Sequence, residues 1–445
     1  MKNARVWSGP RGAAFRVLRE TSRGRTPENS LAVHGLGLDP RDLHLATALV
    51  YEVLRRQSYL DWLWRSRLAS SRDGGLDLAL ILRLGLAQVL FFNRLGDHAI
   101  VSETVALAKI TVPGRQGLVN AVLRGLLRER EAGGPWPPSP PPGPSAAAGL
   151  ALRHSYPAWL AAEFMARLGP AEAEALMAAG NQPAPPTLRV NPRRLNRDEL
   201  CLPFAVRPTL LSPWGLTAET FAGRPDTWPG FAEGLFAVQD EASQLVGLFE
   251  LPAPQAGILD ACAGLGGKAL HLAALNPGAL VTARDKDQAK LDLCAAEARR
   301  LGLTNLRFES RDLLSEGADE HFDLVLVDAP CSGLGVIRRR PDLKWSKGPE
   351  DLTRLAGLQR RLLAAAAGKV RPGGRLVYGV CSLSQAEGPE TAAEFLAGAP
   401  GFRAAPHSAW PAALRPHLMD GCLTLWPHRH QTDGFFWALF ERVKL

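Results

Sequence analysis

From residue 256 onward, short apolar segments alternate with amphipathic segments of helical spacing. The expected strands are residues 257–260, 279–283, 306–308, 322–327 and 375–380, the last of them after the turn 372–374. The expected helices between them are residues 267–275, 288–301 and 352–370. Alternating strands and helices form a mostly parallel sheet, because each connection between parallel strands has to cross a face of that sheet. The sequence therefore predicts a Rossmann-like α/β domain, to which residues 434–440 add a late strand.

Seven prolines within residues 135–144 mark the clearest boundary in the chain. Proline fixes φ and has no backbone N–H, so an extended and fairly stiff linker is expected here. Apolar residues before the linker recur at helical spacing, as they do along 118–127, which predicts an all-helical domain. Residues 150–245 mix a helix near 158–167 with a strand near 187–191. We therefore expect several domains: a helical domain at 1–131, a linker at 132–149, a small α+β domain at 150–245 and the α/β domain at 246–445.

The net charge of +8 lies in the first third of the chain. Residues 1–145 contain 20 Lys+Arg and 12 Asp+Glu, and the 32 basic and 32 acidic residues that remain balance each other. A basic module joined to a neutral body suggests an appendage that binds a polyanion such as RNA. An arginine-rich solvated helical surface is the alternative interpretation.

Composition also limits the class of protein. No run of about 18 apolar residues occurs, and the arginine-rich start of the chain has no apolar core of a secretory signal. The six cysteines form no CxxC pair, which argues against a disulfide scaffold and against a zinc site. We expect a reduced, cytoplasmic protein without a membrane span and without a metal.

A glycine-rich turn, Cys262-Ala-Gly-Leu-Gly-Gly-Lys268, follows the first strand of the α/β domain and opens a helix. Such a turn lets a ligand approach the backbone and the helix N-terminus. The turn fails the P-loop pattern, because Cys262 holds the first glycine position and Ala269 follows the lysine. It fits a loose dinucleotide fingerprint, and the adenosine of S-adenosylmethionine would use the same crevice. Four acids lie near successive strand ends, where ligands of open α/β sheets bind: Asp260, Asp285, Asp312 and Asp328.

Two cysteines, Cys331 and Cys381, each follow a predicted strand of this sheet. A buried cysteine is usually a small apolar core residue. A pair at the ligand-binding edge also suits methyl transfer to carbon 5 of a pyrimidine, which is a poor nucleophile. A thiolate that adds to carbon 6 makes carbon 5 nucleophilic, and an acid–base group must later remove the carbon 5 proton. Spacing alone does not show which cysteine attacks.

The motifs at 260–268, 328–345 and 380–382 strongly resemble those of the RNA cytosine-5 methyltransferases of the NOL1/NOP2/Sun family. The segments 238–244 and 433–436 add to this resemblance. The first 130 residues are similar to the NusB-type helical RNA-binding domain, notably at 58–63 and 117–124. This pairing is typical of the bacterial RsmB group, which methylates 16S ribosomal RNA.

The resemblance implies site residues and a cofactor. Residues Cys262, Ala263, Gly264, Leu265, Gly266, Gly267 and Lys268 would cradle the methionine part of S-adenosylmethionine. Asp285 would hold its ribose, Asp312 its adenine side, and Asp328 would lie near both cofactor and base. The catalytic group would consist of Cys381 as the nucleophile, Cys331 in product release, Asp328 and Lys268.

The chain departs from the family pattern at Leu265, Ala269, Val380 and Gly388, where the family usually has a proline, a hydroxyl residue, a threonine and an asparagine. The first two alter the stiffness of the loop and a hydrogen bond at the start of the helix, so lower cofactor affinity is the expected effect. None of the four removes a group that the covalent step requires.

Other interpretations stay open. The chain could be a catalytically idle RNA-binding or assembly factor, a dehydrogenase that binds NAD, or a methyltransferase for another rRNA or a tRNA. The expected partner is 16S rRNA. The expected oligomeric state is a monomer.

Overall fold

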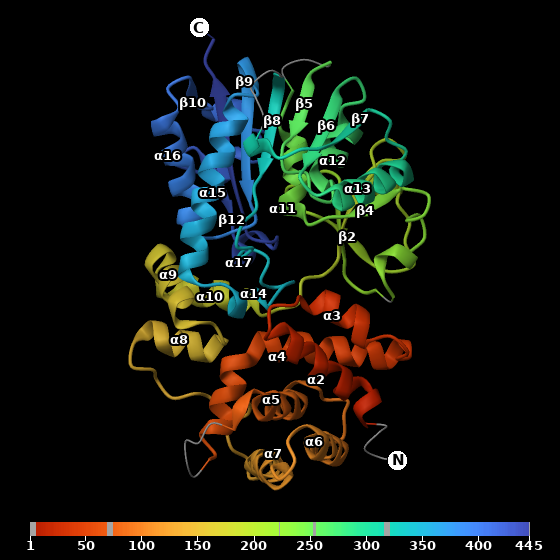
Figure 1. The fold of residues 1–445 in the computed structure, drawn as a ribbon, viewed down its shortest axis with the longest axis vertical. Coiled ribbons are helices and arrows are strands. Elements are labelled where there is room, and N and C mark those ends of the chain that lie inside the picture. The colour runs from red at the N-terminus through yellow and green to blue at the C-terminus, as the bar shows by residue number, and fades with distance from the viewer. Residues whose placement is uncertain (1–5, 69–73, 222, 252–254, 316–320, 445) are drawn as a thin grey trace. The chain divides into compact units, whose positions relative to one another are not determined.

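The computed structural model describes residues 6–68, 74–221, 223–251, 255–315 and 321–444, and it divides into two compact units (Figure 1). The helical unit comprises Met1–Asn181 together with Arg340–Ser346. The sheet unit comprises Gln182–Arg339 together with Lys347–Leu445. The units therefore do not follow the expected boundaries at 149 and 245, since the helices of residues 146–180 belong to the helical unit, where residues 146–154 contact the helix of residues 40–65.

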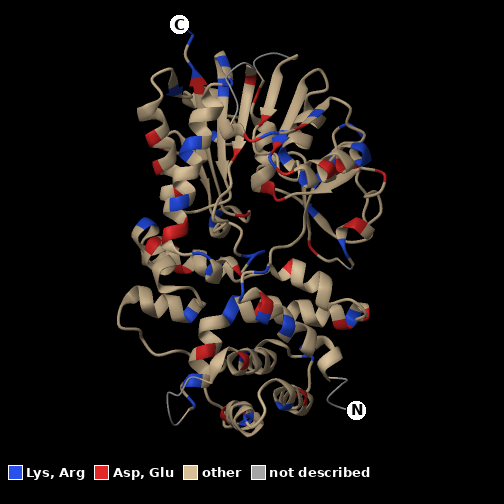
Figure 2. Ribbon diagram, viewed as in Figure 1, with Lys and Arg blue, Asp and Glu red and all other residues tan. Residues whose placement is uncertain are grey.

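The first 181 residues of the helical unit are mainly helical where the structure describes them. Their helices are α2 (Pro10–Thr21), α3 (Pro27–His34), α4 (Pro40–Arg65), α5 (Gly75–Phe91), α6 (Asp97–Thr111), α7 (Gln116–Glu131), α8 (Ala146–His154), α9 (Ala158–Leu168) and α10 (Pro170–Gly180). The apolar faces of α2 and α4–α7 share one core, which confirms the helical domain expected there. Acidic residues are interspersed with the basic ones along these helices (Figure 2), while Arg124 and Arg128 lie exposed on α7.

The proline-rich linker has neither helix nor strand, but it is docked on the helical unit. Trp136 packs against the helical core, and the guanidinium of Arg130 lies 5.4 Å from the centre of its ring. The hydroxyl of Tyr59 donates a hydrogen bond of 2.7 Å to the carbonyl of Pro138. These contacts fix the linker to the helices of the helical unit.

Helix α4 is kinked at Arg56, whose φ of −115° and ψ of 16° are not helical. An unbroken helix would pair the N–H groups of Ser58 and Tyr59 with the carbonyls of Leu54 and Arg55. Instead, both N–H groups point to the Oγ of Ser155, at 3.0 and 3.5 Å. The two carbonyls accept from the segment 340–346, which contains the short helix α14 (Leu343–Ser346). Trp345 Nε1 donates to Leu54 at 2.7 Å and Lys344 Nζ to Arg55 at 2.8 Å.

Lys344 is fully buried within the helical unit. Besides Arg55, its Nζ donates to the carbonyl of Ser155 at 2.8 Å and to Asn181 Oδ1 at 3.0 Å, and it lies 4.3 Å from the centre of the Tyr156 ring. Burial lowers the pKa of Lys344 well below its usual value, whereas three acceptors match the three donors of an ammonium. The geometry favours the ammonium. A lysine that is distant in sequence therefore donates to a backbone carbonyl that the kink leaves without its helical partner.

The sheet unit begins with a small antiparallel sheet in the order β2-β3-β1-β4, formed by β1 (Thr187–Val190), β2 (Val206–Pro208), β3 (Gly215–Ala218) and β4 (Phe236–Val238). It confirms the strand expected near 187–191. Its three other strands are three or four residues long and are not expected from the sequence.

The large sheet has the order β11-β12-β13-β9-β8-β5-β6-β7, with β10 paired to β13. Five strands are parallel: β5 (Gly257–Asp260), β6 (Leu280–Asp285), β7 (Leu306–Ser310), β8 (Phe322–Asp328) and β9 (Val370–Val380). An antiparallel edge consists of β10 (Phe402–Ala404), β11 (Leu418–Met419), β12 (Cys422–Leu425) and β13 (Phe435–Arg442).

Helices cover both faces of this sheet. Helices α12 (Gly267–Leu275) and α13 (Gln288–Leu301) pack on one face with Ile258 and Leu324. Helices α15 (Pro349–Ala367) and α16 (Thr391–Gly398) pack on the other with Leu259 and Val325, because neighbouring strand residues point to opposite faces. The sheet unit also contains the short helices α11 (Glu241–Gln244) and α17 (Pro427–His430). The expected Rossmann-like domain is thus confirmed.

The chain around residue 370 differs from its expected form. The helix expected at 352–370 is α15, which ends at Ala367. The turn expected at 372–374 and the strand after it are parts of a single strand, β9, which starts at Val370. Its pairing with β8 jumps from Phe322–Val370 to Leu324–Arg375, so the proline and glycines form a bulge within the strand. No helix in the described part of the chain is long and apolar enough to cross a membrane.

We predict that Lys344→Met destabilises the protein by about 1–3 kcal/mol, because three buried oxygens would lose their donor. Urea unfolding of the full chain measures this change. Lys109→Met, at an exposed lysine of α6 in the same unit, is the control and should change stability little. Equal stability of the two variants would contradict the role given to Lys344.

Candidate active site

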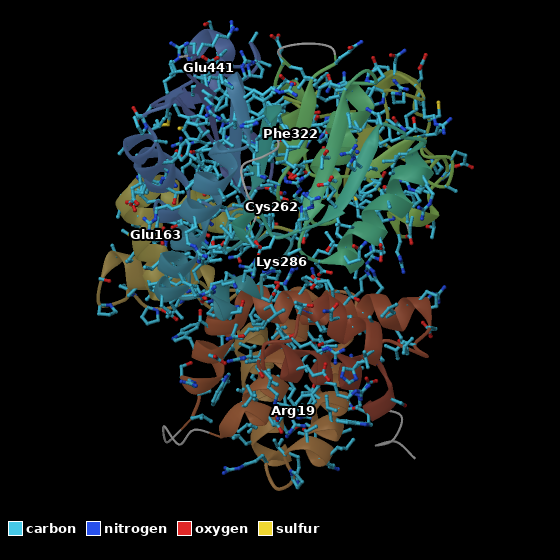
Figure 3. The ribbon with its side chains drawn as sticks, turned by 45° about the horizontal axis from the view of Figure 1, so that its top comes forward. Arg19, Glu163, Cys262, Lys286, Phe322 and Glu441 are labelled. Carbon is cyan, nitrogen blue, oxygen red and sulfur yellow. The ribbon has the colours of Figure 1, made fainter. Side chains whose placement is uncertain are left out.

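The carboxyl edge of the parallel strands gathers the acids that the sequence singled out. Asp260, Asp285 and Asp328 are the last residues of β5, β6 and β8, and Asp312 lies two residues beyond β7. Figure 3 labels Cys262, which follows the carboxyl end of β5, and Phe322, which starts the neighbouring β8 at the opposite edge of the sheet.

The glycine turn has the backbone shape that only glycine adopts easily. Gly264 and Gly266 have φ of +54° and +83°, and a Cβ at Gly266 would collide with the sulfur of Cys294. The N–H of Gly264 donates to Asp285 Oδ2 at 2.9 Å, which ties the turn to the end of β6. Helix α12 starts at Gly267, and its N-cap residue Gly266 provides no side-chain cap.

All four acids act electrostatically on Cys262. Burial first, and then the negative charges of the acids, raise the pKa of the Cys262 thiol; the acids are Asp260, Asp328, Asp285 and Asp312. Burial and the charge of Asp328 also raise the pKa of Asp260 to about 7. This concentration of carboxylates suits hydroxyl and ammonium groups of a ligand. Asp312 is exposed, and its Oδ1 also accepts from the N–H of Leu314 at 3.0 Å.

Lys268 faces the same edge from the first turn of α12. Its Nζ donates to Asp328 Oδ2 at 2.6 Å and lies 5.1 Å from the centre of the Phe435 ring. Burial opposes its charge, but the carboxylate of Asp328 outweighs burial and raises the pKa of Lys268. The site therefore holds a buried ammonium against a half-exposed carboxylate.

Cys331 and Cys381 meet beside this pair. They follow β8 and β9, and their sulfurs lie 3.2 Å apart, within hydrogen-bond reach. The hydrogen bond to Cys381, together with burial, raises the pKa of Cys331 well above its usual value. Cys331 therefore keeps a proton that it can share with Cys381. The structure brings together the two cysteines that the sequence selected. Their positions do not distinguish which of the two sulfurs attacks.

The departures from the family pattern have different surroundings. Ala269 and Val380 are fully buried, whereas Leu265 is 62% exposed. At Gly388, a Cβ would lie 2.9 Å from the Phe436 ring, which leaves little room for a larger residue.

Two groups of residues around the site are not expected from the sequence. Arg339 binds Asp240 and Asp433, each at 2.8 Å, and so joins the segments 238–244 and 433–436 to the end of the Cys331 loop. Glu387 is fully buried and bonded to residues of both cysteine loops. The only sequence signal for it is that a serine follows each cysteine and that an acid lies six residues after the second cysteine.

Comparisons with known proteins agree with this architecture. Residues 249–441 match the family model described as 16S rRNA methyltransferase RsmB/F, residues 8–128 match the NusB family, and residues 156–205 match an RsmF/B-like ferredoxin-like domain. The chain is 35% identical to a probable ribosomal RNA small subunit methyltransferase B of Synechocystis sp., with 97% of this chain and 99% of the relative covered.

A second relative supports the assignment, and a solved structure shares the fold. A ribosomal RNA small subunit methyltransferase B of Klebsiella pneumoniae is 33% identical, with 96% of each chain covered. The solved structure of a methyltransferase homologue from Pyrococcus horikoshii shares the fold, with a TM-score of 0.57, 24% identity, and 68% of this chain and 100% of that chain covered. With the two-unit fold, the glycine turn and the paired cysteines, these matches show that the chain belongs to the RsmB family of ribosomal RNA small subunit methyltransferases.

Proposed function

We propose that this protein methylates carbon 5 of a cytosine in 16S rRNA, with Cys381 as the covalent nucleophile. The observation that carries the proposal is the pair of sulfurs 3.2 Å apart at the carboxyl edge of the sheet, beside the Lys268–Asp328 pair. A methyltransferase without covalent catalysis would need neither thiol. We place the protein in the cytoplasm, where its proposed substrate is made.

S-adenosylmethionine is the cofactor of this family, and it supplies the methyl group when bound. The residues present fit it, since the glycine turn leaves space for a ligand at the uncapped start of α12. We assign residues 262–268 to its methionine part, Asp285 to its ribose hydroxyls and Asp312 to its adenine side. Asp285 keeps unused lone pairs for this task, although each of its oxygens already accepts one backbone N–H.

In the proposed reaction, the thiolate of Cys381 adds to carbon 6 of the cytosine. The negative charge that develops on the ring is stabilised by the ammonium of Lys268, which Asp328 holds at the same edge. After carbon 5 has accepted the methyl group, its proton passes through a base to solvent. The electron pair left behind forms the carbon 5–carbon 6 double bond, and Cys381 leaves as the thiolate that attacked. We assign Cys331 to this release step, because its thiol can donate a hydrogen bond to the departing sulfur of Cys381.

The first test separates the two cysteines. Cys381→Ala should form no covalent adduct with 16S rRNA and transfer no methyl group, because carbon 5 is never activated. Cys331→Ala should attack and methylate, then stall before release and accumulate as an adduct on a denaturing gel. Adducts in Cys381→Ala but not in Cys331→Ala would reverse the assignment, and adducts in neither variant nor the wild type would favour an idle RNA-binding factor.

The second test concerns the ribose site. Asp285→Ala should weaken binding of S-adenosylmethionine about ten- to a hundredfold, the effect of removing one charge-assisted hydrogen-bonding group. Calorimetry measures the affinity. Asp323→Ala is a matched control, because Asp323 also accepts a glycine N–H, from Gly257 at 2.7 Å, but at the opposite edge of the sheet. Similar affinities of the two variants would remove Asp285 from the cofactor site.

The third test concerns RNA docking by the helical unit. Arg124→Gln combined with Arg128→Gln should weaken binding of 16S rRNA and flatten its salt dependence by about 0.7–0.9 log units for each phosphate that is no longer bound. Filter binding at several salt concentrations measures both effects. Arg403→Gln, an exposed arginine on β10, serves as the control. Unchanged affinity and slope in the double variant would mean that this face of α7 does not bind RNA.

A further inference from the structure

Glu387 is a charged residue that is shielded from solvent. Its side chain is fully buried, six residues after Cys381, in the turn Ala386–Glu390 that leads into α16. A buried carboxylate is costly unless several donors pair with it. Four hydrogen bonds reach this one, and all the donors come from other segments of the chain or from the neighbouring loop.

The donors belong to the two cysteine loops and to the helix behind them. Oε1 accepts from the N–H of Ser332 at 2.8 Å and from the side-chain amide of Gln359 at 3.0 Å. Oε2 accepts from the hydroxyl of Ser382 at 2.6 Å and from that of Ser332. Ser332 directly follows Cys331, and Ser382 directly follows Cys381. One carboxylate therefore binds the neighbours of both sulfurs.

Further bonds surround this arrangement. Gln359 also donates to the carbonyl of Pro330 at 3.0 Å, just before Cys331. Tyr378 lies three residues before Cys381, and its hydroxyl donates to the backbone carbonyl of Glu387 at 2.5 Å. The N–H of Gly335 donates to the carbonyl of Cys381 at 3.0 Å. Both loops are thus fixed on either side of their cysteines, and the carboxylate is the group they have in common.

The distance between the sulfurs depends on this common group. The cysteines lie fifty residues apart, and their strands, β8 and β9, are joined by the long excursion of residues 329–369. Strand pairing sets where the strands end, but it does not orient the two loops that follow. Displacement of a reacting group by about 1 Å can cost about a hundredfold in rate.

We propose that Glu387 is a positioning residue that holds the two cysteine loops in register for attack and release. The inference rests on the proposed function, because it takes the roles of Cys381 and Cys331 from it. Glu387 itself lies behind the serines and touches neither sulfur in any hydrogen bond among the described residues.

The replacement chosen for Glu387 determines which bonds are removed. Glu387→Ala removes all four acceptors. Glu387→Gln can keep the geometry: its amide oxygen can accept from Ser332 N–H and Gln359, and its amide nitrogen can donate to the two serine hydroxyls, which are able to rotate. The glutamine variant should therefore retain most of the positioning that the alanine variant lacks.

The test uses the full chain and 16S rRNA transcribed in vitro with 5-fluorocytidine, whose carbon 5 fluorine cannot leave as a proton and so traps the adduct. Glu387→Ala should form this adduct about a hundredfold more slowly than the wild type in a single turnover, and Glu387→Gln within about tenfold. Release is measured with ordinary 16S rRNA. Ser382→Ala should slow mainly adduct formation, and Ser332→Ala mainly release.

Two controls separate positioning from folding. Thr104→Val changes a buried threonine of α6 in the helical unit, whose hydroxyl also donates to a backbone carbonyl, that of Ile100 at 2.7 Å, so it should keep wild-type rates. The affinity for S-adenosylmethionine, measured by calorimetry, should stay within about twofold in the Glu387 variants, because none of the four carboxylate bonds reaches the glycine turn. If Glu387→Ala does not fold, the glutamine and serine variants carry the test.

The outcomes are distinguishable. Wild-type rates of adduct formation and release in Glu387→Ala, or in both serine variants, would overturn the inference while leaving the proposed function intact. A wild-type protein that forms no adduct, or one whose adduct does not require Cys381, would instead overturn the proposed function and the inference with it.

Discussion

Parallel pairing of five strands is the constraint on which the site depends. Backbone hydrogen bonds align β9, β8, β5, β6 and β7 so that their carboxyl ends share one edge. Residues separated by 121 positions in the chain, from Asp260 to Cys381, therefore meet there although their own segments are far apart in sequence. The chain runs outward from β5 in one direction and later returns to β8 on the other side. On one side of β5 the strand ends thus carry Asp285 and Asp312, and on the other side they carry Asp328 and the two thiols.

Much of this edge can be predicted from local patterns. The patterns predict the bounds of α12 and α13 to the residue, because each helix has an unbroken apolar face and a clear start and stop. The last strand, β13, is expected from a run of aromatic residues. The strand β9 is expected to start five residues late, since Pro372, Gly373 and Gly374 usually form a turn and here form a bulge against β8.

The remainder depends on partners that are far away in the sequence. The short strands β2 and β4 carry too few residues to show a period, and they exist because β3 and β1 pair with them. The kink of α4 occurs without a proline or glycine near Arg56, so the sequence does not predict it. Nor does an isolated glutamate at 387 show that it will be buried, because its donors lie as far as 55 residues away. Local patterns point to the reactive groups, but not to the polar residues that hold them.

The discontinuous helical unit has a consequence for how the protein is made. A ribosome releases the chain from its N-terminus, so α2 to α10 emerge while residues 340–346 do not yet exist. During that interval, the carbonyls of Leu54 and Arg55 at the kink have only water as a donor in place of Trp345 and Lys344. The first unit to be synthesised is consequently the one that cannot be finished until most of the second has appeared. If residues 1–181 were transferred alone into another protein, the two backbone carbonyls at the kink of α4 would lack the side chains that bind them here.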